Sequence, residues 1–384
     1  MIYLDHHATT PMAPEVVEAM VAAASQLMGN PSSVHTPGRA ARAAVDSARR
    51  QVAAMINCRE RELVFTSGGT EADNLALRGA WRAQRSCGRN RIVTTAVEHS
   101  AVLSTVEQLE AEGAEVLRIG VDADGRLDRS AFSAAMGDDV GLVSVMLANN
   151  ETGVIFPVAE LVEEAQTAGA WFHCDAVQGA GRLPIDVQDL GVDLLSLSAH
   201  KIQGPKGVGA LFVRRDLPME AIQFGGKQER GLRGGTENTL GIVGFGVAAT
   251  LAAERIATRP FELKALRDHF EASVLSRVDG CVVHGGEQPR LPSVTNIGFD
   301  GIEGEAALLV LDMAGICASS GSACASGSLQ PSHVLLAMGF DPEEAHESLR
   351  FSLGAGVDYA QLDRVVEVLV EQVPKLRALN EMSF

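Results

Sequence analysis

An apolar run, Leu194-Leu195-Ser196-Leu197-Ser198, leads through Ala199-His200 to Lys201. A short apolar run of this kind is typical of a strand buried in a sheet. A second run, Trp171-Phe172-His173-Cys174, ends in Asp175. Both runs therefore predict core strands that lead to an ionisable side chain.

Similar runs alternate with helical patterns through most of the chain. The expected strands are residues 62–66, 91–95, 115–121, 140–147, 170–174, 193–198 and 207–213. Between several of them, apolar residues recur at helical spacing, as in Val102, Val106 and Leu109. This alternation favours an α/β fold with a mainly parallel sheet flanked by helices on both faces. Ligands of such sheets bind beyond the carboxyl ends of the strands, where Asp175 and Lys201 lie.

The pattern changes after about residue 257. Helical stretches near 260–278 and 359–380 flank short expected strands at 293–299 and 348–353, which is typical of a smaller α+β domain. Pro11 and Pro14 break the chain before a helix that begins at Glu15. We therefore expect a large domain over residues 15–257 and a small domain formed by residues 1–14 and 258–384.

Composition argues against several classes of protein. The 384 residues carry a net charge of −17, which disfavours nucleic acid and anionic membrane surfaces as partners. The uncharged stretch from Asn238 to Ala253 is too short to cross a membrane, and the first residues lack the pattern of a signal peptide. The six cysteines contain no CxxC pair, so a cytoplasmic location is expected.

Lys201 and Asp175 together suit one cofactor. A lysine and a carboxylate are costly to bury without partners. Pyridoxal phosphate (PLP) needs a lysine for its Schiff base and an acid for its pyridinium nitrogen. The simpler alternative is a solvated lysine and an ordinary aspartate at the end of a strand.

A candidate phosphate seat follows residues 62–66. There the sequence Ser67-Gly68-Gly69-Thr70-Glu71 opens a helical pattern. Glycines let the backbone approach an anion, and the free N–H groups of a helix N-terminus attract it. Gly69 and Thr70 are thus candidate phosphate ligands. Serine or threonine followed by glutamate is also ordinary helix capping, which is the alternative interpretation.

The segment from Ser319 to Ser328 is rich in Gly, Ser and Ala and is expected to form a mobile, exposed loop. It carries Cys324. Because a structural cysteine usually lies in an apolar core, Cys324 is a candidate nucleophile or carrier, with an incidental surface thiol as the alternative. We interpret the other cysteines as core residues: Cys58, Cys87, Cys174, Cys281 and Cys317.

At this point the chain resembles a known family, the cysteine desulfurases of the NifS/IscS type. The similar motifs are Tyr3-Leu4-Asp5, Gly29-Asn30-Pro31-Ser32-Ser33, Glu98-His99, Asn149-Asn150-Glu151-Thr152-Gly153, His173-Cys174-Asp175-Ala176-Val177-Gln178, Arg233-Gly234-Gly235-Thr236-Glu237-Asn238, Ser319-Ser320-Gly321-Ser322-Ala323-Cys324, Pro331-Ser332-His333-Val334-Leu335 and Arg350-Phe351-Ser352-Leu353. They run in the family's order from residue 2 to about residue 355. The resemblance implies a homodimer with the PLP-dependent transferase fold of type I, in the class V aminotransferase family.

The resemblance also implies a role for each site residue. Lys201 would hold PLP, Asp175 would pair with the ring nitrogen, Gln178 would bond the phenolic oxygen and His99 would stack on the ring. Thr70, Ser198 and His200 would hold the phosphate together with Thr236 from the other subunit. Asn150, which would also line the cofactor site, and Arg350 would bind the substrate carboxylate. No metal is expected, because the adjacent His6 and His7 would diverge on an extended strand.

The implied reaction converts L-cysteine to L-alanine. Lys201 would move the Cα proton, His99 is the candidate for proton transfer at the substrate thiol, and Cys324 would take the sulfur as a persulfide. The family suggests an iron–sulfur scaffold protein as acceptor, hence a role in iron–sulfur cluster assembly. Two alternatives stay open: another PLP enzyme, such as an aminotransferase or a selenocysteine lyase, and a PLP-binding relay or scaffold subunit without activity.

Overall fold

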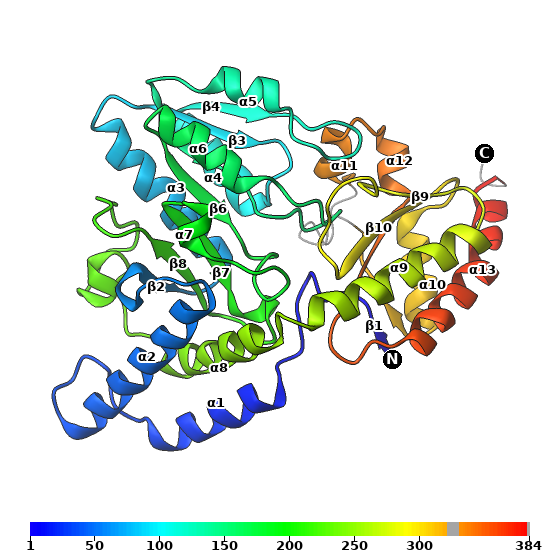
Figure 1. Ribbon diagram of the computed structural model, residues 1–384. Coiled ribbons are helices and arrows are strands. Elements are labelled where there is room, and N and C mark those ends of the chain that lie inside the picture. Colours follow the sequence, from blue (N-terminus) through cyan, green and yellow to red (C-terminus); the bar gives the residue numbers. More distant parts are fainter. Residues whose placement is uncertain (321–329, 382–384) are drawn as a thin grey trace.

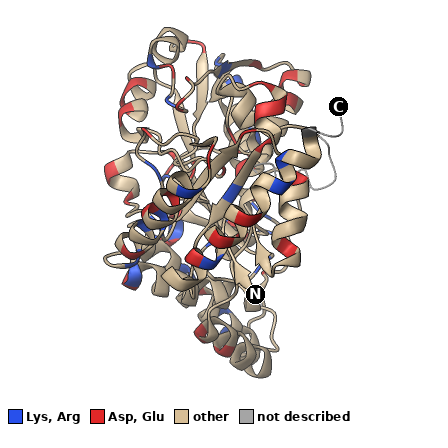
Figure 2. Cartoon of the chain, turned by 90° about the vertical axis from the view of Figure 1, so that its right-hand side faces the viewer, with Lys and Arg blue, Asp and Glu red and all other residues tan. Residues whose placement is uncertain are grey.

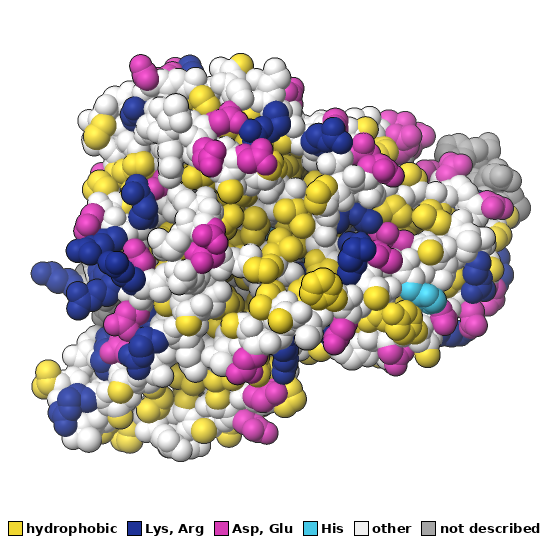
Figure 3. Space-filling model, viewed as in Figure 1, with side chains coloured by type: hydrophobic (Ala, Val, Ile, Leu, Met, Phe, Trp, Pro, Cys, Tyr) yellow, Lys and Arg dark blue, Asp and Glu magenta, His cyan; other side chains and the backbone are white. Residues whose placement is uncertain are grey.

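The computed structural model describes residues 1–320 and 330–381 of the chain, so Cys324 lies outside the described residues. Figure 1 shows a larger lobe and a smaller lobe, with the N-terminus lying in the smaller one. Figure 3 shows apolar side chains gathered where the two lobes meet. The two lobes have separate sheets and separate buried clusters. The division of the chain near residue 257 stays a prediction.

The larger lobe is built on a seven-stranded sheet in the order β2-β8-β7-β6-β5-β3-β4. Its strands are β2 (Leu63–Thr66), β3 (Arg91–Thr95), β4 (Glu115–Ile119), β5 (Val140–Ser144), β6 (Trp171–Asp175), β7 (Leu194–Ser198) and β8 (Gly209–Val213). The pairings from β4 through to β7 are parallel, whereas β8 runs antiparallel to both β2 and β7. The expected mainly parallel sheet is confirmed, and the reversed β8 was not predicted.

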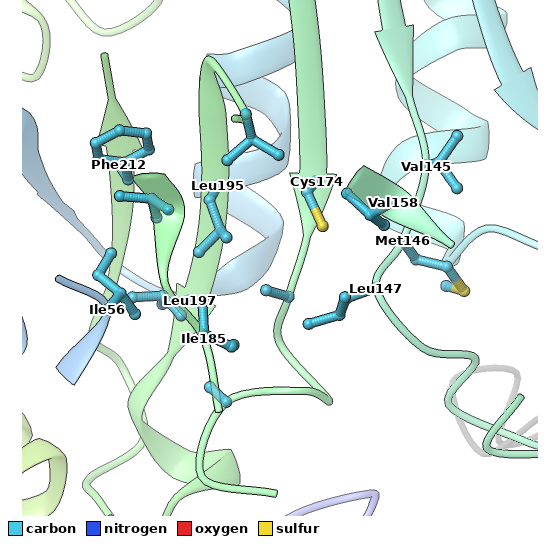
Figure 4. Packing of buried hydrophobic residues seen from close by; sticks show 14 of the residues in the cluster. Ile56, Val145, Met146, Leu147, Val158, Cys174, Ile185, Leu195, Leu197 and Phe212 are labelled. Carbon is cyan, nitrogen blue, oxygen red and sulfur yellow. The ribbon is translucent and has the colours of Figure 1, made fainter. Parts of the chain in front are cut away.

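Helices cover both faces of this sheet (Figure 1). In the larger lobe they are α1 (Pro14–Gln26), α2 (Thr36–Met55), α3 (Gly69–Arg85), α4 (Ser100–Ala111), α5 (Arg129–Ala135), α6 (Val158–Thr167), α7 (Val187–Leu190) and α8 (Thr239–Arg255), with the 3-10 turns η1 (Glu60–Glu62), η2 (Ala199–Lys201) and η3 (Gln228–Gly231). Successive strand residues point to opposite faces. Leu194 therefore packs with α3 and α4, while Leu195 and Leu197 join the cluster on the other face, shown in Figure 4 with Cys174.

The smaller lobe has an antiparallel sheet in the order β12-β10-β9. Its elements are α9 (Arg259–Arg277), β9 (Cys281–Val283), β10 (Val294–Phe299), α10 (Gly304–Met313), β11 (Ile316–Cys317), α11 (His333–Ala337), α12 (Pro342–His346), β12 (Ser348–Ser352) and α13 (Tyr359–Glu381). The short strand β1 (Ile2–Tyr3) pairs in parallel with β11, and Leu4 is buried with Phe270 and Phe351. The N-terminal residues thus pack in the core of the smaller lobe before the chain enters α1.

Surface charge is mixed in sign. Figure 2, turned to face the smaller lobe, shows acidic and basic residues interspersed over its helices. Within the described residues, no single helix is long and apolar enough to cross a bilayer, and only α8 taken together with α9 meets that test, across a bend of 74°.

Candidate active site

A cavity of about 220 Å³ lies beyond the carboxyl ends of β6 and β7. Its walls are formed by Ala8, Gly69, Thr70, Asp73, His99, Met146, Ala148, Asn150, Asp175, Val177, Gln178, Ser198, His200 and Lys201. These include every site residue predicted from the sequence except Thr236, Arg350 and Cys324. Residues from six separate stretches of chain therefore meet at the edge of the sheet where ligands of parallel α/β folds bind.

Strand order explains why Asp175 and Lys201 meet. β6 ends at Asp175, and β7 ends at Ser198 just before the turn η2 that carries Lys201. The two strands are parallel neighbours in which Asp175 lies opposite Ser196. Because parallel neighbours end at the same edge of a sheet, the acid and the lysine face one cavity.

Lys201 is held by the N-terminal segment. Its Nζ donates hydrogen bonds to the carbonyl oxygens of His7 and Ala8, the latter at 2.9 Å. Gln178 Nε2 donates to the same His7 oxygen at 3.0 Å. The His7 ring lies between the Asn150 carbonyl oxygen and Ser293 Oγ, 3.2 Å from each. Ala8 thus forms part of the cavity wall, and the His7 and Ala8 carbonyl groups hold the lysine amine, a role that sequence analysis did not assign.

The end of the cavity formed by α3 suits an anion. α3 begins at Gly69, and a Cβ added there would lie 2.8 Å from the Val177 side chain. A glycine therefore lets the helix start close against the loop after β6. The backbone N–H groups of this first turn and the Thr70 side chain are available to an anionic group. His200 lies on the same side, where burial and the nearby Lys201 lower its pKa to about 4.

Burial sets the charge of the acids and bases in the cavity. Burial raises the pKa of the Asp175 carboxyl, while His99, the Val177 N–H and Lys201 lower it. That N–H donates to Asp175 Oδ1 at 2.9 Å. His99 caps α4, its Nδ1 accepting the Ala101 N–H at 3.0 Å. The proton of a neutral His99 is therefore on Nε2.

Asp73 is a cavity residue that sequence analysis missed. It is 1% exposed, and burial together with the neighbouring Asp175 raises its pKa well above the usual range. His173 Nε2 lies 3.5 Å from its Oδ1, but burial lowers the pKa of His173 to about 3, so this ring is neutral. The available signal was an aspartate on the apolar face of a helix, among Ala72, Leu75 and Ala76.

Four buried polar atoms of the cavity residues have no hydrogen-bond partner among the described residues. They are Asp73 Oδ1, Asn150 Oδ1, Gln178 Oε1 and Ser198 Oγ. Such atoms are costly, since they have lost water without a replacement. A polar ligand in the cavity would satisfy them.

Arg350 lies beside the cavity rather than in its wall. It is 2% exposed on β12, donating from Nη1 to the Asn150 carbonyl oxygen at 3.2 Å and from Nη2 to Asp5 Oδ1 at 2.9 Å. The guanidinium is thus hydrogen-bonded to a cavity residue, and its buried Nε–H is left without a partner among the described residues.

Thr236 is exposed and is absent from the cavity walls of its own chain. It lies in the loop between η3 and α8. Its contribution to a second subunit stays a prediction, as does the role of Cys324.

Metal ligation finds no support in the described ranges, which contain no group of three His, Cys, Asp or Glu residues able to hold an ion. The core interpretation of the cysteines is confirmed for Cys174, which is buried. It is wrong for Cys87, which is exposed, and Cys58, Cys281 and Cys317 are only partly buried. Cys87 follows α3 in a surface turn, where no packing is available.

Comparisons with known proteins agree with this geometry. A family model described as aminotransferase class-V matches residues 2–365. A cysteine desulfurase of Trichormus azollae is 49% identical over 380 residues, covering 99% of this chain and 94% of that protein. A cysteine desulfurase of Cereibacter sphaeroides is 50% identical over 381 residues, covering 99% of this chain and 97% of that protein.

Solved structures give the same result. A NifS-like protein superposes with a TM-score of 0.91 at 33% identity, covering 98% of this chain and 100% of its own. A structure described as "SspA in complex with cysteine" has a TM-score of 0.81 at 33% identity, covering 92% of this chain and 99% of its own. The chain therefore belongs to the class-V aminotransferase family and, within it, to the cysteine desulfurases.

Proposed function

We propose that the protein is a PLP-dependent cysteine desulfurase that converts L-cysteine to L-alanine and carries the sulfur away on Cys324. The observation that carries the proposal is the single cavity in which Lys201, Asp175 and His99 meet beside a helix N-terminus. The relatives named cysteine desulfurase and the related structure with cysteine support the choice of substrate.

The cavity residues fit PLP. Lys201 would hold the cofactor, Asp175 would face the ring nitrogen, Gln178 the phenolic oxygen and His99 the ring face. Gly69, Thr70, Ser198 and His200 would bind the phosphate, with Thr236 from the partner. The unpartnered atoms of Gln178 and Ser198 support this assignment, because both lie where a polar ligand is required. When bound, PLP withdraws electrons from the Cα of the attached amino acid.

The substrate carboxylate would be bound by Arg350 and Asn150. A buried guanidinium needs an anion, and Asp5 engages only Nη2. A planar guanidinium binds a carboxylate through two parallel hydrogen bonds. The guanidinium of Arg350 has N–H groups that Asp5 does not engage, and it lies next to Asn150. It is therefore suited to bind an amino acid by its carboxylate.

Lys201 would move the Cα proton. The carbonyl oxygens of His7 and Ala8 accept its N–H groups, which would keep the amine close to the reacting carbon. His99 would move the proton of the substrate thiol, because its Nδ1 accepts the Ala101 N–H and the proton of its neutral ring is therefore on Nε2.

Sulfur transfer would then use Cys324. Its thiolate attacks the substrate sulfur, an S–S bond forms, and the C–S bond breaks with its electron pair going to carbon. Protonation of that carbon and return of a proton to Cα by Lys201 give alanine, and the enzyme keeps a persulfide. We place the reaction in the cytoplasm of the cell, with an iron–sulfur scaffold protein as acceptor and iron–sulfur cluster assembly as the purpose.

The test is to incubate the protein with L-cysteine and a reductant and to measure sulfide and alanine. Equal amounts of the two products are expected. A keto acid in place of sulfide would show a transaminase. Neither product, despite bound cofactor, would show a relay or scaffold subunit without activity.

A further inference from the structure

The turn η3 is strained and contains one buried residue, Glu229. Glu229 and Arg230 have φ values of +44° and +59°, and Gly231 follows with +82°. The left-handed region is unfavourable for residues other than glycine, so the surroundings must hold these two residues in place. Glu229 is nevertheless only 7% exposed. Its carboxylate must therefore have strong partners.

Those partners are Arg49 of α2 and the backbone of β2. Glu229 accepts hydrogen bonds from Arg49 Nη1 at 2.8 Å, from Arg49 Nη2 at 2.5 Å and from the Phe65 N–H at 2.9 Å. Arg49 also donates to the Leu63 carbonyl oxygen at 2.9 Å and stacks over the Phe65 ring. Such a two-pronged guanidinium–carboxylate pair is strong and geometrically demanding.

The pair occupies the free edge of the sheet. β2 is an edge strand whose only neighbour in the sheet is β8, so its outer N–H and C=O groups need other partners. Glu229 and Arg49 supply these partners at Phe65 and Leu63. β2 leads directly into residues 67–70. By fixing the position of β2, the pair therefore also fixes the position of these residues, which form the phosphate end of the cavity.

A second link joins the same two segments. Arg233 Nε donates to Glu71 Oε1 at 2.8 Å, and Glu71 Oε2 accepts the Ser67 N–H at 2.8 Å. The loop from Glu229 to Thr236 is thus tied at Glu229 and at Arg233 to this chain's own residues 49 and 63–71. Arg49 and Glu229 do not line the active-site cavity. They border a separate cavity of about 580 Å³ between α2 and η3.

We propose that Arg49 and Glu229 are positioning residues for the cofactor phosphate, an inference that rests on the proposed function. Through β2 they place Gly69 and Thr70 at this chain's cavity. Through the loop after η3 they place Thr236, which serves the partner's cavity. One buried ion pair thereby aligns a phosphate ligand for each of the two sites of a dimer.

The experiment uses the variants Glu229→Gln and Arg49→Lys, freed of cofactor and titrated with PLP and, separately, with pyridoxal, which lacks the phosphate. Glu229→Gln keeps the size of the side chain, Arg49→Lys keeps its positive charge, and each breaks the bidentate pair. We expect PLP affinity to fall by about tenfold, the scale of a lost charged hydrogen bond, and pyridoxal affinity to change little. The role of Thr236 is tested by combining Glu229→Gln with Thr236→Ala: if the pair acts partly through Thr236, the two losses are less than additive.

The matched control is Glu271→Gln, which breaks another buried two-pronged pair, with Arg290 at 2.8 and 3.0 Å, in the smaller lobe. It should lower thermal stability without lowering PLP affinity. An equal loss of PLP affinity in the control, an equal loss for pyridoxal, or unchanged affinity in both variants would overturn the proposal. Failure of the unaltered protein to bind PLP would instead refute the proposed function.

Discussion

Gln178 and Lys201 share one acceptor, since both donate a hydrogen bond to the carbonyl oxygen of His7. His7 is in turn fastened through its ring to Asn150 and Ser293. The position of the lysine amine therefore depends on contacts from the N-terminal segment, the loop after β6 and the smaller lobe together. Changes at the site are expected to act through this shared arrangement as well as through single residues.

Lys201→Ala is expected to abolish covalent attachment of PLP, because it removes the amine that the His7 and Ala8 carbonyl groups hold in the cavity. Borohydride reduction followed by peptide mass spectrometry measures the attachment. The exposed Lys206 gives the control, since Lys206→Ala should keep the reducible link. Cofactor fixed to the chain of the Lys201 variant would contradict the assignment.

Arg350→Lys is expected to raise the KM for cysteine by about tenfold or more and to change kcat less. A lysine keeps the positive charge but loses the planar fork that binds a carboxylate. Steady-state kinetics over a range of cysteine concentrations separates the two constants. Arg364→Lys, on the exposed face of α13, is the control and should leave both unchanged. A fall in kcat alone would argue against carboxylate binding by Arg350.

Cys324→Ser is expected to keep cysteine binding, visible as a shift in cofactor absorbance, and to lose sulfur transfer. A hydroxyl is a poor nucleophile toward sulfur and cannot store it as a persulfide. Persulfide labelling after one turnover, followed by peptide mapping, should find the label on Cys324. The control is the exposed Cys87, which tests whether any accessible thiol can accept the sulfur. Because we assign this role to Cys324, Cys87→Ser should be fully active. Full sulfide production by Cys324→Ser would overturn the role.

Mixed dimers of Lys201→Ala and Thr236→Ala chains are expected to regain activity. Each site would take Lys201 from one chain and Thr236 from the other. One site of a mixed dimer would therefore contain neither substitution. Activity after the two inactive proteins exchange subunits is the measurement. If Thr236→Ala alone is inactive and mixing restores nothing, the sites are not shared.

The free energy of unfolding of the Glu98→Gln variant is expected to fall less at high pH than that of the unaltered protein. Burial raises the pKa of the Glu98 carboxyl from 4.5 to about 8, although hydrogen bonds from the Met146 N–H and Thr95 oppose the shift. Between these two pH values the native state keeps a proton that the unfolded state has released. Stability therefore falls as pH rises through this window, by up to about 1.4 kcal/mol per pH unit for one group.

The glutamine variant has no such proton and keeps the acceptor oxygen for Thr95 and Met146. Its free energy of unfolding, compared with that of the unaltered protein, should therefore rise between pH 4.5 and about 8 and level off above that. Urea unfolding of the cofactor-free proteins at a series of pH values measures this difference. A difference that does not depend on pH would show that Glu98 ionises normally.

Local patterns in the sequence were sufficient to predict the mainly parallel sheet and the residues at the centre of the site. The runs before Asp175 and Lys201 form β6 and β7, because a short, largely apolar run between turn signals suits a strand that is buried on both faces of a sheet. Parallel neighbours end at one edge, so the meeting of these two side chains followed without coordinates. The glycine-rich start of α3 was recognisable for the same reason, since its chemistry lies in consecutive residues.

Contacts between distant segments were decided only by tertiary structure. The antiparallel course of β8, the hydrogen bond from Lys201 to the His7 carbonyl group and the burial of Asp73 beside Asp175 do not follow from spacing along the chain. The pair of Arg49 and Glu229 likewise joins residues from two remote segments at the edge of β2. Periodicity reports which face of an element is buried, but the partner on that face depends on how whole elements pack. Local sequence therefore determined the reactive groups of this protein, and packing determined what holds them in place.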